Sequence, residues 1–421
     1  MASRIRVLDS ANSTMQRLGF LKALAALVNE TETSNLETLG RRFVARVTQR
    51  VKLTPPYDDD LKEYARTRLT DGAYRELRKK IMEDAGPAGV ELQDVYLADK
   101  SLPSSTGKLV QANWRNYPYL ATSLEIVKKG TYSGLTRSLV LLAVTPKEEL
   151  AAFAKLDKQN NPLRISECQA AVLLYCLLDN DAAVAVPLLR ALVQRGERFD
   201  ERFAGDMLPD ILREVVASYA KRSLPAEEKD RLSMLGKIAT NIAKWKGKAY
   251  TGGGARQEAI RVRLEPYCDL GLLQKPNREK FEYEPTHSAQ AFMSHYGRAP
   301  DIDEFLQNGF FAAVAACRGV RVRPANDDEA IKALSDAGQA LKSTLGYTPL
   351  TDVGLLAGTW LLTDRHCVLE LGRTVELLKT LQKQDPSFVR FTVDRMGVLA
   401  YVKFLKTEPG GSSARNRLEA I

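Results

Sequence analysis

Histidine and cysteine are scarce in this sequence of 421 residues, which holds three of the first and five of the second. No cysteine pair lies near His287 or His295 with the spacing of zinc ligands, so we expect neither a structural zinc nor a catalytic metal. The cysteines are odd in number and widely spaced, which indicates reduced thiols rather than a disulfide framework. The composition therefore predicts a protein that needs no metal and no cofactor.

Uncharged apolar runs are short throughout the sequence. No such run approaches the roughly 20 residues that a helix needs to cross a bilayer. The first six residues lead into charged and polar residues before any apolar run develops, unlike a secretory signal. We therefore expect a cytoplasmic protein with no membrane partner.

Recognisable catalytic motifs are also missing. The segment Ser104 to Lys108 resembles a phosphate loop, but Leu102 replaces its first glycine and Leu109 replaces the residue that would bind magnesium. His366 and Cys367 are adjacent, so their side chains point apart and do not form a nucleophile and base. We expect a protein that is not an enzyme. A nuclease site assembled from distant segments stays open as an alternative.

Positive charge is in excess, with 61 lysines and arginines against 52 acids, a net charge of +9 and a pI near 9.1. A local excess of this kind favours an anionic partner. Residues 244 to 263 hold six basic residues and one acid, Glu258. The basic and aromatic residues that open this segment are Lys244, Trp245, Lys246, Lys248 and Tyr250. They predict contact with the phosphate backbone of double-stranded DNA.

The same segment continues in a recognisable order. Apolar spacing predicts a helix over 255 to 270, followed by Asp-Leu-Gly-Leu-Leu, a polar turn and the alternating run Phe-Glu-Tyr-Glu before Pro-Thr. This order resembles the second half of a winged-helix domain, in which a recognition helix and a wing grip duplex DNA. The resemblance implies a recognition helix at 255 to 270 and a wing at 274 to 285. It implies DNA contacts by Arg256, Arg261, Arg263 and Lys275, with Lys244, Lys246 and Lys248 anchoring the backbone.

Two other segments resemble the same family more weakly. In segment 108 to 150 a helix is followed by the basic turn with Lys128 and Lys129, and then by Leu-Thr-Arg ending at Arg137. In segment 345 to 405 a helix over about 370 to 383 is followed by a hairpin over 388 to 404. All three segments are therefore candidate winged-helix-like units, and the basic turn and Arg137 are candidate DNA contacts.

Helical periodicity dominates the rest of the chain. Residues 13 to 30 predict an amphipathic helix, and Ser166 to about 222 predicts a bundle scaffold that is interrupted by a turn at Asp179 to Asp181. A helix over 35 to 52 has arginines every fourth residue, at Arg42, Arg46 and Arg50. These arginines form either a phosphate-binding stripe or an ordinary solvated surface.

We therefore expect a mainly α protein with small β-hairpins, in which a helical scaffold bears two or three winged-helix-like domains. The expected divisions are a helical domain (1–100), a winged-helix-like unit (108–150), a scaffold (151–226), the main DNA-binding unit (227–290), a helical linker region (291–344), a third winged-helix-like unit (345–405) and a flexible tail (406–421). Tandem winged helices without catalytic residues resemble DNA-recognition subunits of bacterial restriction and anti-phage systems. The resemblance implies a DNA-binding subunit of a multi-protein defence complex, with homo-oligomers possible. The alternative is a protein-interaction scaffold that binds no DNA.

Overall fold

A computed structural model describes nine stretches of the chain: residues 4–8, 18–31, 116–127, 134–142, 165–244, 255–276, 282–342, 346–393 and 399–405. Helices make up 69% of the described residues and the strands are few and short, which confirms a mainly α protein. The predicted helix with Arg42, Arg46 and Arg50 lies outside these stretches, as do the segment 101–107 and the tail from 406.

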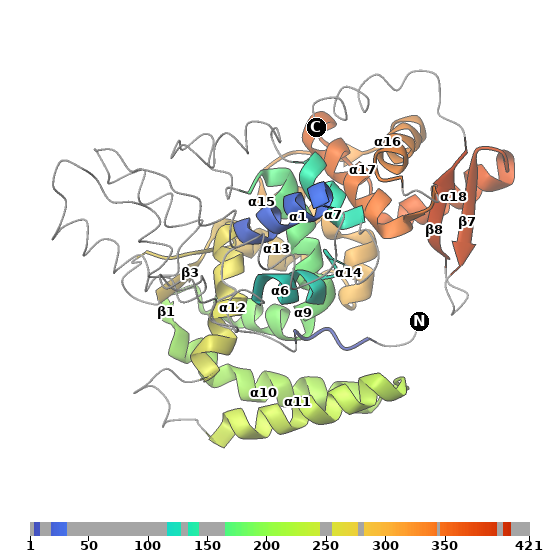
Figure 1. Ribbon diagram of the computed structural model, residues 1–421. Coiled ribbons are helices and arrows are strands. Elements are labelled where there is room, and N and C mark those ends of the chain that lie inside the picture. The colour runs from blue at the N-terminus through green and yellow to red at the C-terminus, as the bar shows by residue number, and fades with distance from the viewer. Residues whose placement is uncertain are drawn as a thin grey trace, which may run out of the picture.

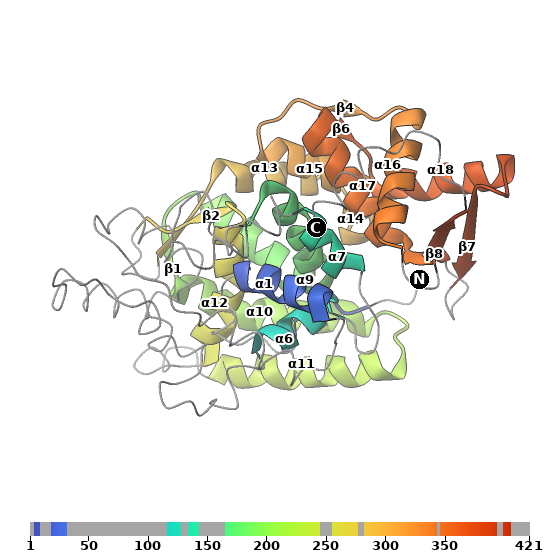
Figure 2. The ribbon, with the colours of Figure 1, turned by 45° about the horizontal axis from the view of Figure 1, so that its top comes forward.

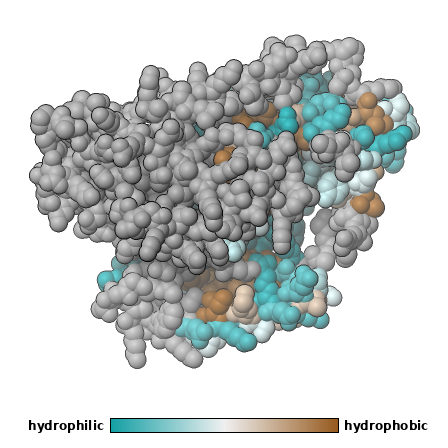
Figure 3. Space-filling model, in the orientation of Figure 1, coloured by the Kyte–Doolittle hydropathy of each residue, from teal (hydrophilic) through white to brown (hydrophobic). Residues whose placement is uncertain are grey.

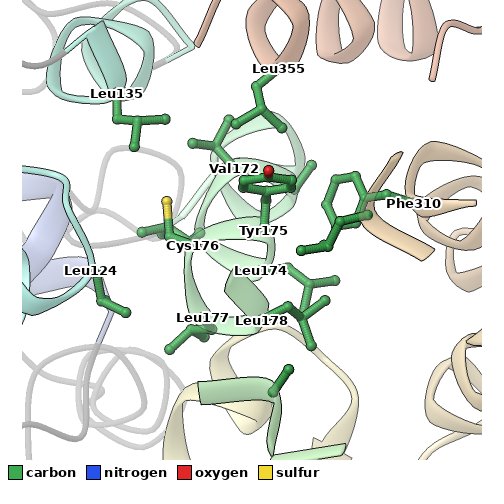
Figure 4. Close-up of a cluster of buried hydrophobic side chains, with 14 of the residues drawn as sticks. Leu124, Leu135, Val172, Leu174, Tyr175, Cys176, Leu177, Leu178, Phe310 and Leu355 are labelled. Carbon is green, nitrogen blue, oxygen red and sulfur yellow. The ribbon is translucent and has the colours of Figure 1, made fainter. Parts of the chain in front are cut away.

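The long helix α9 (Glu167–Arg195) forms the centre of the protein. Ser166, where the predicted scaffold begins, caps its first turn, and the side chain of Gln169 completes a capping box. The helix ends at Gly196, whose positive φ of 68° suits a left-handed cap. Figure 4 shows side chains from several other elements around the middle of α9, and among them the ring of Phe310 meets that of Tyr175 edge to face at 5.4 Å.

One described helix is long and apolar enough to cross a membrane, and it is α9. In its most apolar window, 83% of the residues are buried inside the protein. That burial is what the core helix of a folded protein requires, because helices pack against it on several sides.

The predicted turn at Asp179 to Asp181 is wrong, because α9 continues through it without a break. Asparagine and aspartate favour turns because their side chains compete for local backbone groups. Here those side chains have distant partners instead. Asp179 accepts hydrogen bonds from Arg6, and Asp181 forms a buried ion pair with Arg263. Tertiary contacts therefore override the local preference.

The segment Arg4 to Leu8 makes polar contacts with α9, with α11 (Ala226–Lys244) and with α14 (Ile302–Asn308). The backbone amide of Ala183 in α9 donates to the carbonyl oxygen of Arg6 at 3.0 Å, and the amide of Leu8 donates to Asp181 at 2.8 Å. Arg231 in α11 donates to the carbonyl oxygens of Ile5 and Val7. The side chain of Arg6 also pairs with Asp303 in α14 at 2.7 Å.

Three shorter helices form a group beside α9: α1 (Gly19–Thr31), α6 (Asn116–Ser123) and α7 (Gly134–Leu141). Helix α1 packs against α6 and α7, and α7 packs against α9. The predicted apolar face of the first helix is confirmed, since Leu18, Leu21, Leu24 and Leu27 are all buried. Helix α7 is buried on almost all sides. The hydroxyl of Thr136 on α7 donates to the carbonyl oxygen of Ile126, which ties α7 to the segment that follows α6.

A first three-stranded sheet belongs to residues 199–285, which we name the first sheet unit. Its strands are β1 (Phe199–Asp200), β2 (Leu273–Gln274) and β3 (Glu282–Pro285), antiparallel and in the order β1-β3-β2. Its helices are α10 (Glu201–Ala220), α11 (Ala226–Lys244) and α12 (Ala255–Asp269). Helices α10 and α11 lie side by side along one edge of the molecule in both ribbon views (Figures 1 and 2).

The middle of the chain connects this unit to the carboxy-terminal part. Its helices are α13 (His287–Tyr296), α14 (Ile302–Asn308) and α15 (Phe310–Cys317). Strand β4 (Arg323–Pro324) pairs in parallel with β6 (Cys367–Val368). The rings of Phe292, Phe305 and Phe310 pack edge to face in succession, so these helices share one aromatic core.

Residues 327–404 form a second sheet unit. Helix α16 (Asp327–Ala340) leads to strand β5 (Thr348–Pro349), then to helices α17 (Leu350–Arg365) and α18 (Leu371–Gln384). Strands β7 (Val389–Val393) and β8 (Leu399–Phe404) follow as an antiparallel pair, and the sheet order is β5-β8-β7. The predicted helix and hairpin over 370 to 404 are confirmed. This unit occupies one end of the molecule in both ribbon views (Figures 1 and 2).

Candidate nucleic-acid interface

The helix and hairpin predicted over residues 255 to 285 are present in the first sheet unit. Helix α12 ends at Asp269, and Gly271 adopts a positive φ of 74° so that the chain can turn into β2. The hydroxyl of Thr286 donates to the carbonyl oxygen of Gly271 at 2.7 Å and caps α13. The pattern Asp-Leu-Gly-Leu-Leu followed by Pro-Thr therefore encodes a helix end, a two-stranded pair and a helix start.

Arg263, expected to face DNA, is instead buried inside the protein. Its side chain is 4% exposed, and its guanidinium donates to both carboxylate oxygens of Asp181, with distances of 2.8 and 3.1 Å. The same guanidinium donates to the carbonyl oxygen of Leu8 at 3.2 Å. In this position the side chain joins α12 to α9 and to the amino-terminal segment, and it does not reach the surface.

Lys275, expected in the wing, is buried as well. Its side chain is 4% exposed, and its ammonium lies 2.7 Å from the carboxylate of Glu265, which is fully buried. The hydroxyl of Tyr283 donates to the same carboxylate oxygen at 2.7 Å, and the ammonium lies 5.0 Å from the centre of the Tyr283 ring. Lys275 thus fastens the hairpin to α12 rather than presenting a charge to solvent.

The carboxy-terminal half of α12 is an internal helix. Every residue from 262 to 267 is buried, whereas a helix in a DNA groove needs one exposed face. Of the other predicted contacts, Lys244 ends α11 and Arg256 and Arg261 lie on α12, and the structure describes only their backbone. Arg137 lies half-buried on α7. Six more predicted contacts fall outside the described residues, as Arg42, Arg46 and Arg50 do, and they are Trp245, Lys246, Lys248, Tyr250, Lys128 and Lys129.

The second sheet unit presents basic side chains on α18. This helix is amphipathic, with Leu371, Thr374 and Leu378 buried against its neighbours. Lys379 and Lys383 are exposed on this helix. They are four residues apart and therefore share one face of the helix.

The hairpin β7–β8 adds two more cations. Arg390 and Lys403 are direct partners across the antiparallel pair, on the same face of the sheet. Like charges in this position repel one another and cost stability, unless an anion lies between or above them. The ammonium of Lys403 lies 5.3 Å from the centre of the Tyr347 ring, which holds it on the side of β5.

We name these four residues, Lys379, Lys383, Arg390 and Lys403, the basic surface of the second sheet unit. Among the described residues, no ion pair is found for Lys379, Lys383 or Arg390. Figure 3 shows mostly hydrophilic atoms at this end of the molecule, with a few apolar residues among them. The spacing of the lysines on α18 and the positions of the cations in the hairpin indicate this surface in the sequence. Basic residues are denser at 244 to 263, and the sequence-based prediction of DNA contacts therefore favoured that segment.

The amino-terminal end of α18 is packed into the protein. The carboxylate of Glu370, the residue before the helix, accepts hydrogen bonds from the backbone amides of Phe311 and Ala312 at 3.1 and 2.9 Å. Gly372 lies so close to α14 that a Cβ atom there would be 2.3 Å from the Oδ1 atom of Asn308. The start of α18 is therefore anchored on the junction between α14 and α15.

Burial raises the pKa of Glu370 to about 7, and hydrogen bonds from backbone amides oppose that rise only in part. Because the folded state binds this proton more tightly than the unfolded state, the contribution of Glu370 to stability is greatest below pH 4.5. It is lost as the pH rises through 7.

Between pH 4.5 and pH 8 the free energy of unfolding of the wild-type protein should fall by roughly 3 kcal/mol more than that of the Glu370→Gln variant, which has no carboxyl group to titrate at this position. Urea denaturation across that range measures it. Glu376→Gln, on the exposed side of the same helix, is the matched control and should leave the dependence unchanged. Parallel pH profiles for the Glu370→Gln variant and the wild-type protein would contradict the expectation.

Side chains able to bind metals are dispersed in the described part of the chain. No group of three histidines, cysteines or acids there could hold a metal ion, and all five cysteines are free thiols. Burial and the nearby Arg298 lower the pKa of His295.

The basic surface and the sheet topology of the second sheet unit are therefore the described features that bear on function. The sequence matches no protein-family model, no curated protein and no solved structure.

Proposed function

We propose that this protein binds duplex DNA through its second sheet unit, as a non-catalytic subunit of a larger complex. The observation that carries the proposal is the basic surface of that unit, where Arg390 and Lys403 are direct partners across the hairpin and the exposed Lys379 and Lys383 lie on α18. A phosphate backbone relieves that repulsion, and neutralised phosphates release counterions, which favours binding.

The topology of the second sheet unit supports a winged-helix identity. Its elements run helix, strand, helix, helix and hairpin, apart from the two-residue strand β6, which precedes α18 and pairs with β4 outside this sheet. The first strand of the sheet pairs with the last. In this arrangement α18 takes the place of the recognition helix and the paired strands β7 and β8 take the place of the wing. The first sheet unit has the same strand order, but the carboxy-terminal half of its corresponding helix α12 is buried. We therefore propose that the first unit is a structural relative of the second.

Salt dependence tests the binding. With about four phosphates neutralised, log affinity against log salt should have a slope near −3 to −4 for duplex DNA. Replacing all four residues of the basic surface with alanine should bring the slope close to zero. The matched control is Lys229→Ala with Lys237→Ala, two exposed lysines on one face of α11. Failure of the wild-type protein to bind any duplex at low salt would refute the proposal.

The second candidate is a protein-interaction scaffold. It is favoured by three exposed apolar residues of the hairpin, Val393, Tyr401 and Leu405, which are 56%, 42% and 37% exposed. Such residues suit a protein interface as well as a wing. Binding that is independent of salt, or absent for DNA, would favour this candidate. A cleavage assay on plasmid DNA with magnesium tests whether the protein is also a nuclease.

A further inference from the structure

The way α18 is packed determines which of its residues can approach a ligand. No residue from 371 to 374, the first turn of the helix, is exposed. Glu370 and Gly372 anchor that turn on α14 and α15. A recognition helix normally inserts its amino-terminal residues into the major groove and reads base edges with them. That end of α18 is occupied by the protein itself.

The next residues along α18 are also unsuited to reading bases. Arg373 pairs with Asp327 of α16 at 2.8 Å, so its charge is committed to a neighbouring helix. Glu376 is exposed and negative, which repels both phosphates and the electronegative groove. Free cations appear only from Lys379 onward, in the last two turns.

The hairpin has the opposite properties. Strand β7 is at the edge of its sheet, and β8 holds it through five residue pairs. Phe404 of β8 packs so tightly on α16 that a Cβ atom on Gly338 would lie 2.2 Å from its ring. The base of the hairpin is therefore rigid, while Arg390, Tyr401 and Val393 are exposed along it.

From these observations we infer that the hairpin is the main DNA-contacting element and that α18 lies along the phosphate backbone with its carboxy-terminal half. Recognition is then of duplex shape and backbone, with little discrimination among base sequences. This inference rests on the proposed function. It adds that the hairpin makes the main contact and that the shape and backbone of the duplex are what is recognised.

Two double variants that remove equal charge separate this mode from insertion of α18. Arg390→Ala with Lys403→Ala should weaken binding to a 30-base-pair duplex by about 10-fold or more and flatten the salt slope by about 2 units. Lys379→Ala with Lys383→Ala should weaken it by less than about 3-fold. Circular dichroism and thermal unfolding verify that both variants stay folded. A larger loss for the α18 variant would overturn the inference.

A conservative variant and a sequence panel provide independent readouts. Arg390→Lys should bind within about 3-fold of the wild-type protein, because a backbone contact needs charge whereas a bidentate base contact needs the guanidinium. Affinities for unrelated duplexes of equal length should also agree within about 3-fold. Strong preference for one sequence, or loss of binding in Arg390→Lys, would overturn the inference. Absence of binding by the wild-type protein would instead refute the proposed function on which it rests.

Discussion

Replacing Asp181 with alanine is expected to lower the free energy of unfolding by about 3 to 5 kcal/mol, because it removes the buried carboxylate that accepts two hydrogen bonds from the guanidinium of Arg263. Both side chains are less than 5% exposed, so water cannot replace the lost contact. The amide of Leu8 also loses its acceptor. Urea denaturation of the purified variant measures the loss.

The exposed pair of Arg213 and Asp210 is the matched control. Its side chains are 56% and 60% exposed, and Asp210→Ala should therefore cost less than about 1 kcal/mol. If Asp181→Ala were as stable as this control, the buried pair would not hold α12 against α9. If Arg263→Ala reduced DNA affinity while stability was unchanged, the sequence-based assignment of Arg263 to DNA would be correct after all.

Lys275→Met should be nearly as damaging, with an expected loss of about 3 to 5 kcal/mol. Methionine preserves the length of the side chain, so packing changes little. The variant leaves the carboxylate of Glu265, which is fully buried, without the ammonium that lies 2.7 Å from it. Thermal and urea unfolding should both register the change.

The double variant Lys275→Met with Glu265→Gln distinguishes charge from shape. Removing both charges should recover most of the lost stability, because a neutral buried pair carries no uncompensated charge. The hydroxyl of Tyr283 keeps an acceptor in the glutamine carbonyl. A double variant no more stable than Lys275→Met would show that the ammonium itself, rather than charge balance, holds the hairpin.

Local pattern was sufficient to predict the elements of the fold. Apolar spacing placed α12, α18 and the hairpin after α18 close to their observed bounds, because each depends on neighbours within a few residues. The predicted scaffold began at Ser166, which is the residue that caps α9. These signals need no knowledge of the rest of the chain.

The candidate site could not be predicted in the same way. The partner of Arg263 is Asp181, which lies 82 positions away in the sequence. The local sequence around Asp181 predicted a turn, and it gave no indication of a contact with Arg263. An arginine on an amphipathic helix has the same local pattern whether its partner is a phosphate or a buried carboxylate. Charge density therefore located basic segments, but only the fold distinguishes structural cations from exposed ones.

The extended segment Arg4 to Leu8 also sets an order of events during synthesis. Its hydrogen-bond and ion-pair partners at Asp181, Arg231 and Asp303 are 173 to 297 residues further along the chain. Closing such long loops is entropically costly, and contacts of this range slow folding. The segment leaves the ribosome first among these residues, yet Arg6 can complete its contacts only after residue 303 has emerged. The earliest residues of this chain are therefore among the last to reach their final positions.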